Sequence, residues 1–185
     1  MPDGMKPKLL LHCCCAPCAG SVLERLAPLY RVTVLFYNPN ILPREEYDRR
    51  AAELYKLPTL AVRPGSDDLI IGNYDADIFE AAAAPFADEP EGGRRCRACF
   101  ELRLAETAKR AREGGFDFFA TTLSVSPHKN AAIINEIGSV LAGESGVPLL
   151  RADFKKQDGY KRSVELSKQY GLYRQTYCGC KKSNK

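Results

Sequence analysis

The chain has no long hydrophobic run. No stretch of its 185 residues is apolar enough to cross a membrane, and the first twelve residues lack the apolar length of a signal peptide. It also has no internal repeat, and its net charge of +4 is mild. Such a charge permits a nucleic-acid partner without arguing for one. We therefore expect a soluble, cytoplasmic protein with no membrane partner.

The composition is that of an ordinary globular protein, with 45% hydrophobic and 27% charged residues. A chain of this length can bury one substantial core but is too short for two comfortable domains. We expect a single domain over residues 1–185. Its core would occupy residues 8–171, and residues 172–185 would form a tail that carries two cysteines.

Short apolar, β-branched or aromatic runs alternate with amphipathic segments along the chain. Five runs are predicted as strands: 8–12, 31–37, 59–63, 116–123 and 148–154. Six segments are predicted as helices: 19–29, 43–57, 75–84, 97–113, 130–141 and 160–170. This alternation implies crossover connections and hence an α/β fold, a parallel sheet of about five strands with helices on both faces.

Polar or thiol-rich segments follow three of the predicted strands. Residues 13–18, 38–40 and 124–130 each come after a strand ends. Ligands of parallel α/β sheets gather at the carboxyl ends of the strands, so these three segments should share one functional edge. The remaining cysteines, before a long helix and in the tail, can fold back over that edge.

The eight cysteines carry the clearest chemical signal. They form three groups: Cys13, Cys14, Cys15 and Cys18; Cys96 and Cys99; Cys178 and Cys180. In an intracellular protein such thiols are mostly reduced, which favours metal or redox chemistry over a disulfide framework. A Cys-x-x-Cys pair at a helix start can aim both sulfurs at one point, where the helix dipole lowers the thiol pKa. Two such pairs that converge would make a four-sulfur site for a soft metal.

Three interpretations of this site compete. A four-thiolate zinc site suits the ligands, although its two pairs lie far apart for a compact zinc ribbon. A thioredoxin-like dithiol at Cys15 and Cys18 would leave the other thiols unexplained. Only an iron–sulfur cluster with spare thiols beside it gives a role to nearly all of the cysteines. Cys13 is then the expected bystander, because neighbouring side chains diverge in an extended segment, and His12 is expected in the core or behind the ligands.

The Cys178-Gly179-Cys180 segment has two possible roles. With one intervening residue, a disulfide there would be strained and easily reduced. The glycine supplies the backbone freedom that such a bond, or the chelation of one metal, requires. The sequence leaves both roles open.

Six motifs occur in order along the chain: HCCCAPC (12–18), FYNPNI (36–41), EGGRRCRACFELRL (91–104), TTLSVSPHKN (121–130), FKKQDGY (154–160) and YRQTYCGC (173–180). Together they resemble the QueH-type epoxyqueuosine reductases, the cobalamin-independent enzymes of the last step of queuosine biosynthesis. The resemblance covers nearly the whole chain, from about residue 8 to residue 180.

The resemblance implies an oxidoreductase that reduces epoxyqueuosine to queuosine at the wobble position of tRNA. It also implies a [4Fe-4S] cluster and a Rossmann-like fold related to the nucleotide alpha-hydrolases. Thiols replace the phosphate loop that such relatives often carry after the first strand, so we expect no ATP site. Motif by motif, the implied cluster ligands are Cys14, Cys15, Cys96 and Cys99.

The resemblance further implies a catalytic role for Cys18, Cys178 and Cys180. Some members carry an acidic residue where Cys18 stands, which favours a ligand of a neighbouring metal over a cluster ligand. Cys178 and Cys180 would form a redox-active pair or, with Cys18, hold an adjacent mononuclear iron.

The number of electrons that the reaction consumes favours a second redox-active group beside the cluster. Turning an epoxide into an alkene consumes two electrons and two protons and releases water, whereas a [4Fe-4S] cluster normally carries one electron at a time. An adjacent iron or a dithiol would supply the second electron. The iron would also bind the epoxide oxygen and weaken the C–O bond. The electrons would come from an external donor such as a ferredoxin or flavodoxin.

The charged and aromatic residues near the expected edge are candidates for tRNA contacts. Cations that would bind anticodon-loop phosphates are Arg94, Arg95, Lys155, Lys156, Lys161 and Arg162. Tyrosines that would either stack on unpaired bases or lie partly buried in the core are Tyr37, Tyr160, Tyr173 and Tyr177. The loop after the fourth predicted strand adds His128 and Lys129 as candidates for substrate contacts, and His128 would act as a proton donor or cap the loop.

Overall fold

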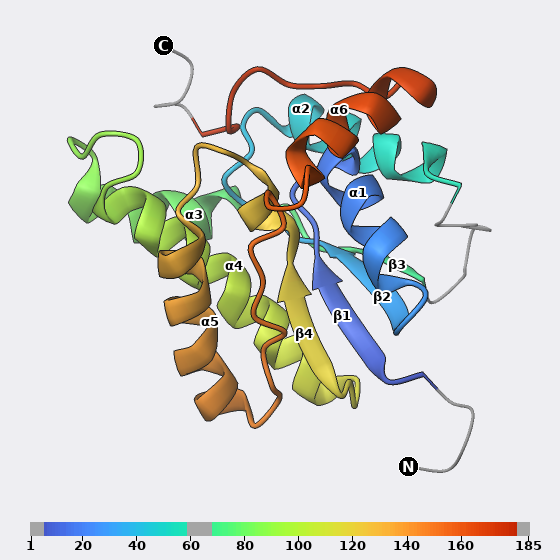
Figure 1. Cartoon of the computed structure of the whole chain (residues 1–185). Helices are drawn as coiled ribbons and strands as arrows, with labels where there is room; N and C mark the ends of the chain where they lie inside the picture. The colour runs from blue at the N-terminus through green and yellow to red at the C-terminus, as the bar shows by residue number, and fades with distance from the viewer. Residues whose placement is uncertain (1–5, 59–67, 181–185) are drawn as a thin grey trace.

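The computed structural model describes residues 6–58 and 68–180. Within them, one parallel sheet runs in the order β3-β2-β1-β4 (Figure 1). Its strands are β1 (Lys8–His12), β2 (Arg31–Phe36), β3 (Leu69–Ile71) and β4 (Phe118–Thr121). The predicted α/β fold with a parallel sheet is therefore confirmed, with four strands in the described part of the chain against about five predicted.

Helices cover both faces of the sheet (Figure 1). The α-helices are α1 (Ala16–Leu26), α2 (Arg44–Ala52), α3 (Ala76–Ala83), α4 (Arg94–Glu113), α5 (Ala131–Ser145) and α6 (Gly159–Gln169). Three 3₁₀ turns complete the described elements: η1 (Glu53–Lys56), η2 (Ala84–Phe86) and η3 (Thr122–Val125). No helix among these has the length and apolar character needed to cross a membrane.

Alternate side chains of β1 pack into two different parts of the hydrophobic core. Leu9 and Leu11 are fully buried in a cluster with the apolar side of α1, whereas Leu10 is buried in a second cluster with α4 residues. Successive side chains of a strand point to opposite faces, so a continuous apolar run is what a strand buried on both sides requires. This packing fixes the edge where β1 and β4 end.

Cysteine and proline define the start of α1 just beyond that edge. Cys15 is the N-cap residue in an extended conformation, and Pro17 lies in the first turn. Proline suits this position because its missing N–H would have no helical partner there. The chain therefore turns sharply after β1, with Cys14 before the cap and Cys18 one turn into the helix.

Two of the predicted strands need comment. The strand predicted at 59–63 lies outside the described residues, and β3 at Leu69–Ile71 was not predicted. The fifth strand predicted at 148–154 was wrong, because this segment forms only an isolated parallel bridge between Leu149 and Phe119. Beyond this bridge, the Asn135 side chain makes the hydrogen bonds that a neighbouring strand would otherwise make. Its amide donates to Ala152 O at 3.1 Å and accepts from Ala152 N at 3.2 Å.

We expect Asn135→Ala to lower the free energy of unfolding by about 1–3 kcal/mol, because two hydrogen bonds of the 148–154 segment are lost. Urea denaturation would measure this change. Val140→Ala on the same helix is the matched control, since Val140 is 60% exposed. Equal unfolding free energies for the two variants would contradict the assigned role of Asn135.

Candidate functional site

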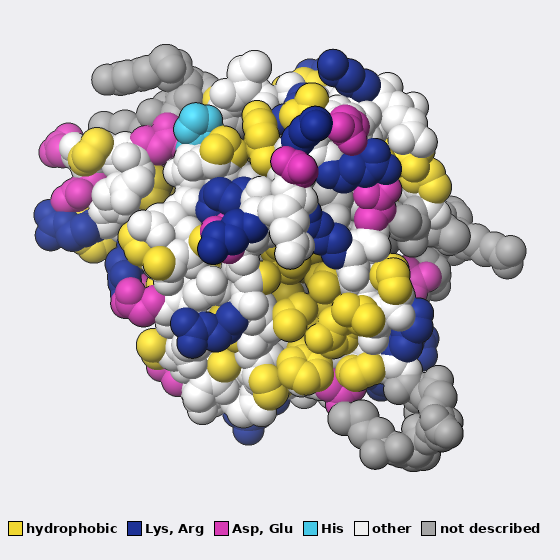
Figure 2. Space-filling view, in the orientation of Figure 1, with side chains coloured by type: hydrophobic (Ala, Val, Ile, Leu, Met, Phe, Trp, Pro, Cys, Tyr) yellow, Lys and Arg dark blue, Asp and Glu magenta, His cyan; other side chains and the backbone are white. Residues whose placement is uncertain are grey.

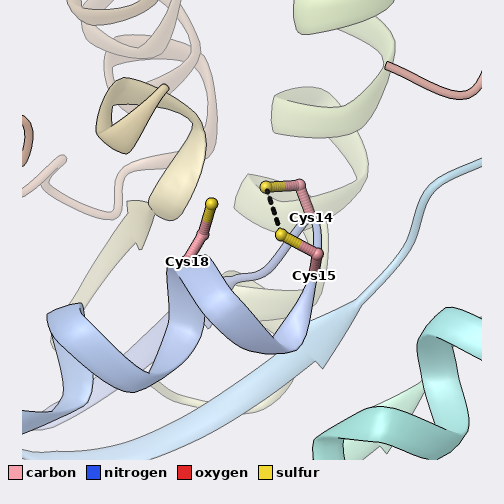
Figure 3. Close-up of side chains that lie close together, drawn as sticks. All are labelled: Cys14, Cys15 and Cys18. Atoms are coloured by element: carbon pink, nitrogen blue, oxygen red, sulfur yellow. Dashed lines mark hydrogen bonds between the residues drawn. The ribbon is translucent and has the colours of Figure 1, made fainter. Parts of the chain in front are cut away.

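Three thiols lie together at the carboxyl edge of the sheet (Figure 3). The sulfurs of Cys14, Cys15 and Cys18 are all within 4.8 Å of one another, and Cys14 Sγ lies 3.8 Å from Cys15 Sγ. Thr122, at the start of η3, accepts a hydrogen bond from Cys14 N at 3.2 Å and so ties this loop to the end of β4. Sulfurs at this spacing can share a metal or a cluster.

Hydrogen bonding concentrates the negative charge of this group on Cys14. Hydrogen bonding with the Cys15 and Cys18 side chains holds the Cys14 pKa well below its ordinary value. Hydrogen bonding with Cys14 raises the pKa of Cys15 to about 11 and raises the pKa of Cys18 well above its ordinary value. Cys14 is therefore the thiol of this group that ionises most readily.

Four thiols line a second, small cavity of about 90 Å³. They are Cys96, Cys99, Cys178 and Cys180. Cys96 lies in the first turn of α4, where its sulfur accepts a hydrogen bond from Gly92 N at 3.2 Å. Burial raises the pKa of Cys96 and raises that of Cys99 to about 11.

The small cavity adjoins a larger one of about 560 Å³, which the Cys14, Cys15 and Cys18 thiols line. Residues that line both cavities are Asn40, Glu91, His128, Lys129 and Cys178. Cys14 and Cys96 also pack against the same apolar cluster around Phe100. The structure therefore brings seven cysteines, all except Cys13, to two adjoining cavities.

A fully buried arginine lies between the thiol groups. Arg103, on α4, is 1% exposed and donates to the Cys99 sulfur at 3.8 Å and to Asn38 Oδ1. Asn38 in turn donates to Cys13 O at 2.8 Å. Burial opposes the positive charge of Arg103, but the nearby Cys99 and Cys14 sulfurs outweigh it and raise the Arg103 pKa.

Lys129 is a second cation beside the thiols. It is half-buried in the loop after η3 and lines both cavities. Burial would lower its pKa, but the Cys178 and Cys14 sulfurs raise it overall. Arg103 and Lys129 together supply positive charge where thiolates gather.

The C-terminal thiols are held by α2. Arg50 is 2% exposed and donates to Cys178 O at 3.0 Å, while its Nε donates to Glu46 at 2.7 Å. The guanidinium also lies 5.0 Å from the centre of the Tyr177 ring. Leu42 N donates to Gly179 O at 2.9 Å, so the tail is also bonded to the loop before α2.

No disulfide is formed by the eight cysteines, all of which are described. The possible Cys178–Cys180 disulfide is therefore not supported. Gly179 has φ of +119°, a conformation that glycine adopts readily, and it lies against Ile41. Arg95 donates to the Cys180 sulfur at 3.1 Å.

The predicted tRNA-binding cations lie in different environments. Arg95 is 5% exposed and donates to the Cys180 sulfur, whereas Arg94 is exposed and paired with Glu89. Lys155 pairs with Asp153 and Arg162 with Glu24, while Lys156 and Lys161 are exposed. Figure 2 shows basic side chains in several separate groups interleaved with acidic ones, not one continuous basic stripe.

The predicted tyrosines also differ. Tyr160 is exposed and Tyr177 partly buried, and both line the larger cavity. Tyr37 is buried, and burial raises its pKa. Tyr173 lies beneath the Arg49 guanidinium, 3.5 Å from its ring centre, and donates to Glu46 at 3.2 Å.

The two histidines differ in burial. His12 is fully buried, and its Nε2 donates to Tyr37 O at 3.1 Å, so Nδ1 accepts from the Thr121 hydroxyl at 2.8 Å. Burial lowers the His12 pKa to about 3. His128 is exposed at the rim of both cavities. Cys13 is fully buried in the main apolar cluster.

The residues present fit a sulfur-ligated metal centre. Buried side-chain donors without a hydrogen-bond partner include Arg95 Nε and Arg103 Nε, each on a residue that lines one of the two cavities. Cluster sulfides and ligand thiolates accept hydrogen bonds from such donors. Thiolates, buried cations and spare N–H donors therefore meet in one place.

Several site residues were not predicted from the sequence. Arg50, Arg103 and Arg174 line the larger cavity but occur in helices or in the tail, where an arginine is usually solvated. The asparagines of FYNPNI were placed at the edge by their position after a strand, but that pattern assigned them no role. A charged residue at an otherwise apolar helix position is the only sequence signal for Arg103.

The fold and site define a class: a parallel α/β protein with adjoining thiol-lined cavities at the carboxyl edge of its sheet, a lining that could hold a metal. The sequence model of the family described as "Epoxyqueuosine reductase QueH" matches residues 9–185. The chain belongs to this family, which is one of oxidoreductases, so the predicted enzyme class is confirmed.

Curated relatives named "Epoxyqueuosine reductase QueH" support this membership. That of Staphylococcus epidermidis is 43% identical over 96% of this chain and 76% of its own length. That of Streptococcus pyogenes is 41% identical over 96% of this chain and 71% of its own length. That of Thermotoga maritima is 36% identical over 93% and 88%, respectively.

We expect Arg50→Lys to release the cysteine-bearing tail, because Arg50 bonds Glu46 through Nε and the tail carbonyls through its two other nitrogens, whereas lysine has a single nitrogen. Charge-assisted hydrogen bonds contribute about 1.5–3 kcal/mol, so iodoacetamide should alkylate Cys178 about tenfold faster or more. Peptide mass spectrometry would measure the rate. Arg44→Lys is the control on the same helix, since Arg44 pairs with Asp48 at the surface and lies over the Tyr74 ring, and neither of these residues belongs to the tail. Equal alkylation rates in both variants would contradict the role of Arg50.

Proposed function

We propose that this protein reduces epoxyqueuosine to queuosine in the anticodon loop of tRNA. The observation that carries the proposal is the thiol-lined cavity of about 560 Å³ at the sheet edge of a member of this reductase family. The volume lies within the roughly 300–1,000 Å³ of small-ligand sites, which suits a single modified nucleoside. The wobble nucleoside must then leave the anticodon stack to reach the thiols.

The cofactor in this proposal is a [4Fe-4S] cluster held by Cys14, Cys15, Cys96 and Cys99. When bound, it supplies the electrons of the reduction one at a time. Arg103 lies against Cys99 and offsets the negative charge of the ligands. Its unpartnered Nε, like that of Arg95, is available to donate toward sulfur.

The remaining thiols face the substrate side in this proposal. Cys18 and Cys178 line the larger cavity, and Cys180 lines the smaller one beside Arg95. We assign them either an adjacent iron or a pair of reducing thiols. The electrons come from an external donor such as a ferredoxin or flavodoxin.

The reaction converts the epoxide to an alkene with two electrons, two protons and the release of one water. Lys129 Nζ lines the cavity wall that would face the ring, and the neighbouring sulfurs raise its pKa and so favour its protonated form. It can donate one of the two protons to the departing oxygen. The exposed Tyr160 at the cavity rim offers a surface on which a neighbouring base can stack.

We expect Cys178→Ser to abolish turnover of epoxyqueuosine in tRNA while the visible absorption of the cluster and the sulfide content of the anaerobically purified protein stay largely unchanged. The reason is that Cys178 borders both cavities but is assigned no cluster ligation. Mass spectrometry of digested tRNA would measure conversion with a chemical reductant. Cys13→Ala is the control and should keep its turnover, because Cys13 is buried away from both cavities.

Two results would contradict the proposal, at different points. One is full turnover by Cys178→Ser, which would remove the assigned role of the tail but not the reductase function. The other is a colourless wild-type protein with one zinc per chain and no conversion, which would favour a zinc-dependent RNA-binding module. Neither this module nor a thioredoxin-like dithiol is favoured by the family membership.

A further inference from the structure

Four buried side-chain atoms in the described residues have no hydrogen-bond partner: Asn40 Oδ1, Arg95 Nε, Arg103 Nε and Gln175 Oε1. All four belong to residues that line the two thiol-lined cavities. An unsatisfied buried polar atom costs about 1–3 kcal/mol, so such atoms concentrated at one site indicate ligands.

The four atoms divide by chemistry into two donors and two acceptors. The arginine N–H groups suit thiolates and sulfides, which accept hydrogen bonds. The amide oxygens of Asn40 and Gln175 do not, because a sulfide has no proton to give them. These two oxygens therefore require a ligand that carries O–H or N–H donors.

Both acceptors line the larger cavity beside the thiol group. Asn40 is 1% exposed and follows β2, whereas Gln175 belongs to the tail. The Gln175 side chain lies beside the Cys15 sulfur and helps to lower the pKa of that thiol, while its buried oxygen has no partner. A donor group bound between them would lie next to Cys15.

The charge of the cavity bears on which donors it can bind. Four cationic side chains line it, Arg50, Arg103, Lys129 and Arg174, against the single acid Glu91. Hydroxyl groups are neutral donors, so this charge does not oppose them. The reacting ring must also lie beside the thiols, where the two spare acceptors are.

We propose that Asn40 and Gln175 bind the hydroxyl groups of the substrate's carbocyclic ring and so hold it beside the thiols. This inference rests on the proposed function and names the residues that recognise the ring within it. Because Asn40 belongs to the core and Gln175 to the tail, a hydroxylated ring joins both segments. Their role is one of binding and specificity, and no electron or proton passes through them.

The test compares two RNA anticodon stem-loops, one with queuosine and one with guanosine at the wobble position, on the anaerobic, iron-loaded protein. Queuosine carries the hydroxylated ring without the epoxide, so binding is read without turnover. The variants are Gln175→Met and Asn40→Leu, which remove the acceptors at similar size. Fluorescence anisotropy would measure the Kd values.

We expect each variant to raise the Kd for the queuosine RNA about fivefold to tenfold, the effect of one lost hydrogen bond, with the Kd for the guanosine RNA unchanged. Asn40→Asp and Gln175→Glu keep the acceptor oxygen and should retain discrimination between the two RNAs. Gln169→Met, on the exposed side of α6, is the matched control. Iron content and melting temperature would show that each variant is folded and loaded.

Unchanged discrimination in both Gln175→Met and Asn40→Leu would overturn the inference. If the wild-type protein still reduced epoxyqueuosine in that case, only the inference would fail. A wild-type protein that reduces no epoxyqueuosine with any reductant would overturn the proposed function, and the inference with it.

Discussion

The buried guanidinium of Arg103 is the interaction on which the arrangement of the site depends. Thiolates brought together repel one another, and burial makes each of them harder to ionise. Arg103 lies against Cys99 and, through Asn38, is bonded to the backbone of Cys13. One cation from α4 thus connects the helix that carries Cys96 and Cys99 with the loop that carries Cys14 and Cys15. A neutral residue there would leave Cys99 without the buried cation that donates to its sulfur.

The C-terminal tail depends on a second buried ion pair. Arg50 and Glu46 lie one turn apart on α2, with side chains only 2% and 9% exposed. Burying such a pair carries a desolvation penalty of several kcal/mol per ion, which further hydrogen bonds must offset. Cys178 O and the Tyr173 hydroxyl supply them. The hydrogen bonds that stabilise the buried ion pair therefore also hold the Cys178 segment over the cavities. The position of the tail and the stability of α2 depend on the same contacts.

The sequence predicted those parts of the structure that local patterns control. Buried strands such as β1 and β2 are apolar runs, and the rule that ligands gather at the carboxyl edge correctly brought Cys13–Cys18, Asn38 and Lys129 to one edge. The 148–154 segment has the composition of a strand, but Asn135 satisfies part of its backbone and only one bridge to β4 forms. The residues of a short apolar segment alone do not show whether it will pair fully with a neighbouring strand, as β1 and β2 do, or form a single bridge, as the 148–154 segment does.

For the same reason, the sequence could not predict which arginines are buried. Arg94 and Arg95 are adjacent and chemically identical, yet one faces solvent and the other donates to Cys180. The helical turn of about 100° per residue directs them differently, and the tail that covers Arg95 comes from 85 residues further along the chain. Long-range packing thus turns a surface cation into part of the site.

The position of Cys178 follows from these constraints. The core supplies one thiol group at the end of β1 and another at the start of α4, and the two cavities that they line adjoin. The tail crosses where the cavities meet, since Arg50 holds Cys178 O and Leu42 N holds Gly179 O. Cys178 therefore lines both cavities. A residue so placed can respond to events in either one, which is the property that a link between a source of electrons and a bound ring requires. The glycine at 179 lets the chain reverse after it and direct Cys180 to Arg95 in the smaller cavity.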